Sequence, residues 1–234
     1  MLNQIKDLVY ELLNSDNSGH GIDHIIRVYD LALKFADTEQ ANKEIVAIAS
    51  LLHDVDDYKI VGIENSGNLT NAKNIMNKVD ISTEIQTAVL DIIQNMGYSK
   101  FLGGIRPKSL EGKIVSDADM CDAMGSSGII RSVIYTVSDK GSGVIFDKNV
   151  YPNVNITAKE YNSQGTTHDT DSAINHFFEK LLKLPNLMMS NAGKQEALKR
   201  SKIMIDFLEN LFYEENALEW TQYLDNYIKK LQLK

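Results

Sequence analysis

A histidine and an aspartate stand next to each other at the end of an apolar segment, in the sequence ASLLHDVDDYK. The pair is His53 and Asp54, and polar residues become frequent directly after it. A neutral imidazole beside a carboxylate is a good ligand pair for a borderline divalent cation. Because such dipeptides are also common by chance, the pair needs support from other parts of the chain.

A second candidate histidine lies in the segment HGIDHIIRV. His20, His24 and Arg27 are spaced i, i+4 and i+7, so a helix would present two imidazoles and a guanidinium along one stripe. The alternative is a solvated polar face opposite the isoleucines, and this segment taken alone favours that alternative.

The third candidate is a group of three aspartates in SDADMCDAMG. Asp119 and Asp122 are i, i+3 neighbours on a helix, and like charges that close are unfavourable unless a cation or another partner neutralises them. The alternative is an exposed acidic edge. That alternative fits poorly with the apolar residues of the segment, which are Ile114, Val115, Ala118, Cys121 and Met124.

The elements that must position these residues are predicted to be helices. Only three prolines occur, and apolar residues recur mainly at spacings of three and four. Thr83 and Gln86 have the spacing of a capping box, and Ser109 is a candidate N-cap. Helices are expected over residues 2–12, 22–36, 42–53, 68–79, 83–93, 110–121, 128–138, 171–184, 192–213 and 217–231.

The segment from 140 to 170 differs, because it is rich in Gly, Asn, Thr and Ser. Loops of this length in compact domains are usually functional lids or disordered. We therefore expect an all-α fold with a catalytic helical core over residues 1–138. Residues 139–234 are expected to form the long loop and a C-terminal helical subdomain packed on that core.

The overall composition excludes several classes of protein. The net charge is −8, so no attraction to nucleic-acid backbone or to an anionic membrane is expected. The single cysteine, Cys121, excludes an internal disulfide and fits a reducing, cytoplasmic compartment. No signal peptide, transmembrane span or phosphate-cradling glycine loop is apparent.

The order His, His-Asp, Asp in an all-helical chain resembles the HD superfamily of metal-dependent phosphohydrolases. The resemblance covers about Gly19 to Arg131, through the motifs HGIDHIIRV, LLHDVDDYK and SDADMCDAMG. More narrowly, the chain looks like the bacterial branch of single-domain HD hydrolases, and INHFFEKLLKLPNLMMSNAGKQEAL looks like that branch too. The resemblance implies an HD-domain helical bundle and four metal ligands, which are His24, His53, Asp54 and Asp119.

The resemblance also implies that the ion is manganese, magnesium or another first-row divalent metal. Two imidazoles and two carboxylates form a mixed nitrogen and oxygen set that suits such ions. No histidine lies between His53 and Asp119, whereas dinuclear members of the superfamily need extra histidines there, so we expect one ion. The ion would act as a Lewis acid and would activate water for hydrolysis.

Asp57 is the candidate general base or water-orienting residue, acting beside Asp54. It falls where members of the family often carry a carboxylate, although a surface acid in a turn next to Asp56 is an equal alternative. Lys59, Arg27 and His20 are candidates to bind phosphate oxygens through charge-assisted hydrogen bonds.

Two further pairs are candidates for supporting roles. Asp23 and Asp122 could accept hydrogen bonds from ligand histidines or from substrate hydroxyls. His176 and Lys180 are i, i+4 neighbours and could face the site from the cap, or they could belong to a plain amphipathic helix.

The resemblance thus predicts hydrolysis of a phosphate ester or anhydride, with a nucleotide as the expected substrate class. Monoester, diester and pyrophosphate cleavage stay open, and so do a monomer and a homodimer. One alternative is a hydrolase of a signalling nucleotide, such as a guanosine polyphosphate or a cyclic nucleotide. The glycine-tyrosine-proline signature of the cyclic-dinucleotide group is missing, however. Another alternative is a non-catalytic module that senses a nucleotide or a metal.

Overall fold

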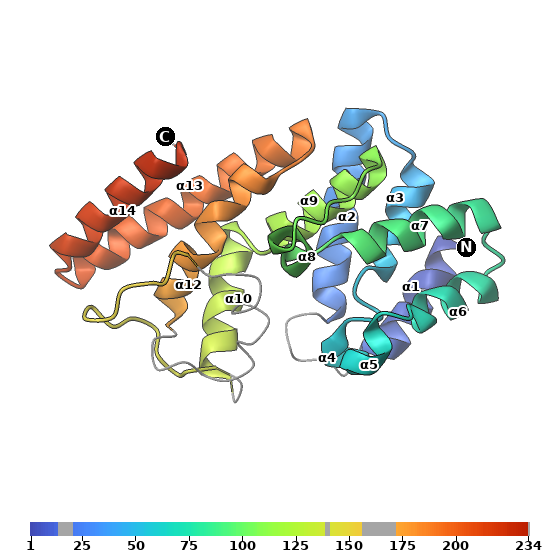
Figure 1. Cartoon of the computed structure of the whole chain (residues 1–234), viewed down its shortest axis with the longest axis horizontal. Coiled ribbons are helices and arrows are strands. Elements are labelled where there is room, and N and C mark those ends of the chain that lie inside the picture. Colours follow the sequence, from blue (N-terminus) through green and yellow to red (C-terminus); the bar gives the residue numbers. More distant parts are fainter. Residues whose placement is uncertain (14–20, 139–140, 156–171, 234) are drawn as a thin grey trace. The chain divides into compact units, whose positions relative to one another are not determined.

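All regular elements in the described part of the chain are helices, as the computed structural model shows (Figure 1). The described residues are 1–13, 21–138, 141–155 and 172–233, and for Tyr58, Lys59 and Ile63 the description covers the backbone alone. The prediction of an all-α fold is therefore confirmed. Among the described residues, no helix combines the length and the apolar character that crossing a membrane requires.

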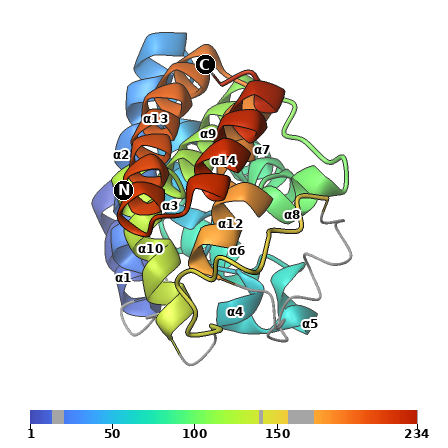
Figure 2. The same ribbon diagram turned by 90° about the vertical axis from the view of Figure 1, so that its left-hand side faces the viewer.

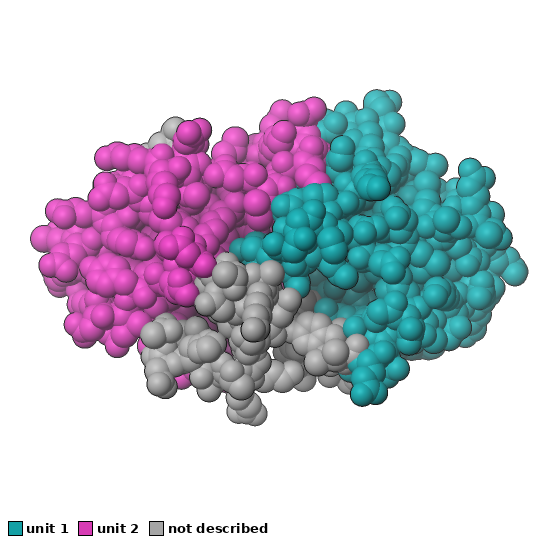
Figure 3. All heavy atoms as spheres, viewed as in Figure 1, with its two compact units in different colours: residues 1–119 teal, residues 120–234 magenta. Residues whose placement is uncertain are grey.

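The chain divides into two compact units, Met1–Asp119 and Met120–Lys234 (Figure 3). The boundary falls inside one continuous helix, α9 (Leu110–Asp122), so this helix begins in the first unit and ends in the second. The functional division at residue 138 into a catalytic core and a cap stays a prediction.

The first unit is organised around a central helix, α3 (Lys43–Leu52), which packs against α1 (Leu2–Leu13), α2 (Ile22–Glu39) and α7 (Thr83–Asn95). All residues of α3 from Val46 to Leu52 are buried, as expected for a helix covered on every side. α6 (Thr70–Lys78) packs against α1 and α7. Three short helices complete the unit, namely α4 (Tyr58–Val61), α5 (Ile63–Ser66) and α8 (Tyr98–Leu102).

Side-chain caps fix where several of these helices begin. The Asn42 side chain accepts hydrogen bonds from the first turn of α3, and Ser109 accepts one from the Gly112 amide at 3.1 Å. The predicted cap at Ser109 is therefore confirmed. The predicted capping box at Thr83 is wrong, because Ser82, one residue earlier, is the N-cap of α7 and accepts from the Ile85 amide at 3.4 Å.

The second unit contains α10 (Gly125–Val137), α12 (Ala173–Glu179), a 3-10 helix (Leu181–Leu187), α13 (Asn191–Glu214) and α14 (Leu218–Leu231). α13 and α14 run side by side in both views (Figures 1 and 2). Their core includes Trp220, the single tryptophan of the chain, which is 1% exposed. Its ring lies 4.7–5.9 Å from the rings of Phe146, Tyr151, Phe178, Phe212 and Tyr223.

Residues 144–155, which we call the strap, cross this unit without regular structure and are bound to its helices. The Val144 and Ile145 carbonyls accept hydrogen bonds from the first two amides of α12, each at 3.1 Å. The Trp220 indole donates to the Lys148 carbonyl at 3.0 Å, and the Asn153 amide donates to the Glu179 carboxylate at 2.9 Å. This part of the predicted long loop is therefore built into the second unit. Residues 156–170 of that loop lie outside the described residues.

Replacing Tyr151 with alanine should expose one face of Trp220, because the two rings are stacked at 4.7 Å. We expect tryptophan emission to shift to longer wavelength and the free energy of unfolding to fall by about 1–2 kcal/mol. Tyr213→Ala, at a side chain that is 81% exposed, is the matched control and should change neither quantity. Unchanged emission in Tyr151→Ala would contradict the described strap.

Candidate metal centre

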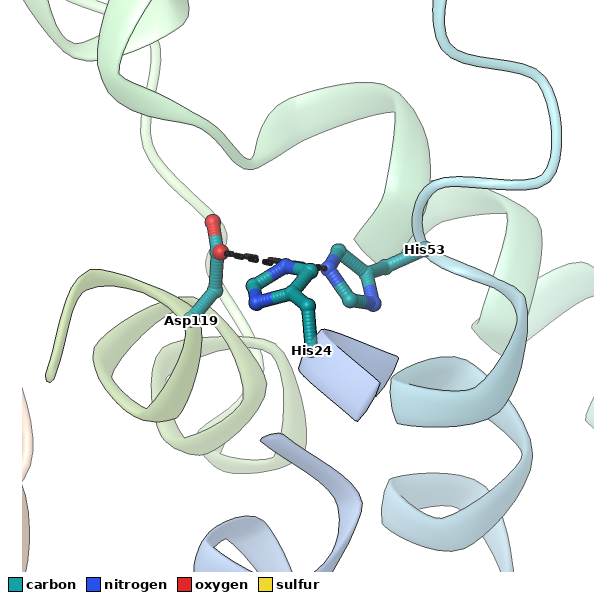
Figure 4. A group of neighbouring side chains, drawn as sticks. All are labelled: His24, His53 and Asp119. Atoms are coloured by element: carbon teal, nitrogen blue, oxygen red, sulfur yellow. Dashed lines mark hydrogen bonds and ion pairs between the residues drawn. The ribbon is translucent and has the colours of Figure 1, made fainter. Parts of the chain in front are cut away.

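Two histidines from different helices meet inside the first unit. His24 lies in the first turn of α2, and His53 directly follows the last residue of α3. Their Nε2 atoms are 3.2 Å apart, and their side chains are 2% and 1% exposed. Figure 4 shows both rings directing these nitrogens toward the same point, together with the Asp119 carboxylate.

Two carboxylates approach the same pair of nitrogens. One Asp54 oxygen lies 3.4 Å from His24 Nε2 and 3.6 Å from His53 Nε2. One Asp119 oxygen lies 3.4 Å and 3.8 Å from the same two atoms. The structure therefore brings together all four side chains that the sequence predicts as ligands, although they come from three separate stretches of the chain.

The spacing of these donors fits a divalent ion. Bonds of about 2.0–2.2 Å to nitrogen and oxygen place neighbouring donors roughly 3.0–3.6 Å apart around an octahedral or tetrahedral ion. The measured separations between each histidine and its neighbouring donors run from 3.2 to 3.8 Å. Two imidazole nitrogens and two carboxylate oxygens are also the donor types that first-row divalent metals prefer.

The backbone of α3 prepares His53 to bind through Nε2. Its Nδ1 atom lies 2.9 Å from the Ser50 carbonyl oxygen. Since a carbonyl can only accept a hydrogen bond, Nδ1 carries the proton, and the lone pair of the neutral ring is on Nε2. This arrangement fixes both the tautomer and the ring orientation, as is usual for histidines that bind metals.

Asp119 is held in its charged form, although its surroundings desolvate it. Burial alone would raise the pKa of its carboxyl group, but the hydrogen bond with His24 and the electrostatic attraction of the His53 and His24 rings outweigh burial. The pKa of Asp119 consequently lies below its usual value. The side chain is still 26% exposed, so one edge of the centre is open to solvent.

The other predicted residues of the first unit lie close to the ligands in sequence. Asp57 is partly buried, lies in the turn after α3, and donates its amide to the Asp54 carbonyl at 3.0 Å. Asp23 and Arg27 flank His24 on α2, and both are exposed. His20 and the side chain of Lys59 lie outside the described residues, so their predicted phosphate contacts stay predictions.

The predicted residues of the second unit have identifiable surroundings. Asp122 is 1% exposed and forms an ion pair of 2.7 Å with Arg131, and Cys121 is fully buried, as its apolar face predicts. His176 and Lys180 lie in and directly after α12, and burial together with Lys180 lowers the pKa of His176 to about 3. A neutral His176 leaves Lys180 as the positive charge of this pair.

The residues that hold the turn after α3, residues 53–57, in place carry no recognisable signal in the sequence. The Asp56 carboxylate accepts hydrogen bonds from the Asn71 and Ala72 amides at the start of α6, each at 2.9 Å. In the sequence, Asp56 stands out only as the neighbour of Asp57. A local sequence pattern does not predict these hydrogen bonds, because Asp56 is fifteen residues from Asn71 and sixteen from Ala72 in the chain.

Comparison with known proteins places this geometry in a family. The HD domain family matches residues 21–124. YpgQ from Bacillus subtilis is 30% identical over 210 residues, which are 89% of this chain and 90% of that protein. The chain therefore belongs to the HD-domain family. Within that family it is close to the bacterial single-domain proteins of the YpgQ type.

Solved structures agree with this assignment along almost the whole chain. A Lactobacillus plantarum protein has a TM-score of 0.76 at 34% identity, and a Bacillus thuringiensis protein described as an HD-superfamily hydrolase has 0.71 at 33%. YpgQ in complex with ADP has a TM-score of 0.69 at 28% identity. Each of the three comparisons covers 92% of this chain and 97% of the other.

Removal of divalent metal should lower the melting temperature, because the clustered carboxylates then lose the charge that holds them together. With free metal at about a hundred times its Kd, the ion stabilises the fold by about 2.7 kcal/mol, or roughly 5–10 °C. Calorimetry before and after dialysis against EDTA measures this shift. The melting temperature of the Asp54→Ala variant should not change when metal is added or removed. An unchanged wild-type transition after verified metal removal would contradict the centre.

His176 should stay neutral as the pH falls, because its pKa is lowered from 6.5 to about 3. The unfolded chain takes up this proton below pH 6.5 and the folded chain does not, so stability is lost from pH 6.5 downward. NMR should show no titration of the His176 ring between pH 7 and 4. His176→Gln should reduce the loss of stability in acid. A ring that titrates near pH 6.5 would contradict the described environment.

Proposed function

We propose that this protein is a metal-dependent phosphohydrolase that cleaves a phosphate ester or anhydride of a nucleotide. The observation that carries the proposal is the convergence of two imidazoles and two carboxylates on one point in the first unit. The ADP complex of YpgQ, a relative of similar length, supports a nucleotide as the ligand class.

A divalent ion at this centre would supply the positive charge that an acidic protein needs to bind a phosphorylated substrate. A chain with a net charge of −8 repels polyphosphates unless positive charge is concentrated locally. His24, His53, Asp54 and Asp119 would hold one divalent ion, with manganese or magnesium as the leading candidates. When bound, the ion supplies a Lewis acid for phosphate oxygens and makes water acidic enough to act as a nucleophile near neutral pH.

The remaining chemistry falls to side chains next to these ligands. Asp57 follows Asp54 by three residues and would orient the attacking water and accept its proton. Arg27 lies one turn beyond His24 on α2 and would donate hydrogen bonds to phosphate oxygens, with Lys59 and His20 as further donors. Asp54, as both a ligand and a neighbour of the water, would act in positioning and in catalysis.

The second unit carries three further residues that the sequence predicts as substrate contacts, namely His176, Lys180 and Asp122, and these contacts stay predictions. Lys180 offers a positive charge, and His176 offers a neutral imidazole that can donate or accept a hydrogen bond. Asp122, paired with Arg131, would act on the substrate only through that pair. Each of these three side chains can be replaced without changing a candidate metal ligand.

A panel of nucleotides assayed with manganese, magnesium, cobalt and zinc tests the proposal, with the products identified. We expect turnover of at least one nucleotide that depends on added metal. Asp54→Ala should reduce kcat at least a hundredfold, because it removes a ligand and a residue beside the nucleophile. Asp30→Ala is the matched control, since Asp30 is an exposed carboxylate on α2, and it should keep wild-type activity.

The product pattern separates the alternatives. Release of phosphate, release of pyrophosphate and opening of a cyclic nucleotide identify a monoesterase, a pyrophosphohydrolase and a signalling-nucleotide hydrolase, respectively. Tight nucleotide binding without turnover under any metal would contradict catalysis and favour the sensing module.

A further inference from the structure

The turn that carries Asp54 is tied to the start of helix α6 by three hydrogen bonds. Asp56 accepts from the amides of Asn71 and Ala72 through its two carboxylate oxygens, both at 2.9 Å. The Asn71 side chain returns a hydrogen bond of 2.9 Å to the Val55 carbonyl. Both residues that directly follow Asp54 are therefore bound to the same helical turn.

The Asp56 carboxylate acts as the N-terminal cap of α6, because the residue at the N-cap position of this helix provides no side-chain hydrogen bond. The residue at the N-cap position is Leu69, whose side chain has no acceptor and whose φ is 50°, in the left-handed region. A left-handed conformation is unfavourable for a residue with a side chain such as leucine. Without Asp56, the Asn71 and Ala72 amides would lose their acceptors in a partly buried place.

The cap connects the turn to the packed part of the first unit. Asp56 is 4% exposed, and α6 buries Ala72, Ile75 and Met76 against its neighbours α1 and α7. The turn itself contains no long regular element, since α4 begins only at Tyr58. Its position is therefore set by the end of α3 on one side and by α6 on the other.

We propose that Asp56 is a positioning residue that, through its cap on α6, holds the Asp54 carboxylate at the metal centre. The inference rests on the proposed metal centre and extends it. Both oxygens of the Asp56 carboxylate are bound to helix amides, so its effect on a metal ion would pass through the backbone of residues 54–56. The capped turn of α6 and the metal-bound turn then stabilise each other, because each fixes the backbone that the other needs.

Titration of full-length protein with Mn²⁺, followed by the EPR signal of the free ion and without nucleotide, tests this inference. Asp56→Ala should raise the Kd for Mn²⁺ tenfold or more, the range found when partners of metal ligands are removed. Asp56→Asn and Asn71→Ala keep part of the contact and should raise the Kd by less. The melting temperature of each metal-free variant shows that it is folded at the temperature of the titration.

Ser82→Ala is the matched control, because Ser82 caps α7 in the same unit and touches neither the turn nor α6's first amides. It should lower the melting temperature of the metal-free protein and leave the Kd for Mn²⁺ unchanged within about twofold. Wild-type affinity in folded Asp56→Asn and Asn71→Ala would overturn the inference. An equal loss of affinity in Ser82→Ala would overturn it as well.

Amide hydrogen exchange distinguishes this coupling from a role of Asp56 in stability alone, because only the coupling makes exchange in α6 depend on metal. Binding of metal should slow amide exchange at Asn71 and Ala72 in the wild type, while the first turn of α7 stays unchanged. No slowing at α6 would overturn the coupling. Since no nucleotide is present, a protein that binds Mn²⁺ but never turns over a substrate contradicts the proposed function alone. A wild type that binds no divalent ion would overturn both proposals.

Discussion

The first unit depends on holding two carboxylates and two imidazole nitrogens within 3.2–3.8 Å of their neighbours. Such a cluster is unfavourable by itself, because charged oxygens lose water and approach each other. The fold meets this constraint by placing each donor at a fixed point of a helix. His24 is in the first turn of α2, His53 follows the end of the buried helix α3, and Asp119 is in α9.

The helices and the ligand set could be predicted because both leave local traces in the sequence. Apolar spacing of three and four residues marks the helices, and an abrupt change of polarity after Leu52 marks the end of α3. The three short motifs around His24, His53 and Asp119 then carry the family resemblance that implies the four candidate ligands. These side chains do lie together, even though the residues alone had favoured a solvated face for the helix of His24.

Contacts between distant segments could not be predicted in the same way. Asp56 gives no sign in the sequence that its acceptors serve amides more than a dozen residues away. The strap belongs to a segment whose length and composition predict a lid or disorder, and its order comes from the Trp220 indole, from Asn153 and from the buried Glu179. The predicted cap of α7 was displaced by one residue, because backbone conformation decides that the Ser82 hydroxyl, and not that of Thr83, reaches the helix amides.

The position of the single tryptophan decides what optical experiments can observe. Trp220 is buried in the second unit, whereas all four candidate ligands belong to the first. Indole emission therefore follows the melting of residues 120–234 and does not report local opening around the candidate metal centre. Heat capacity records the unfolding of both units. Any disagreement between the two signals on heating would measure how far the halves of the chain unfold independently.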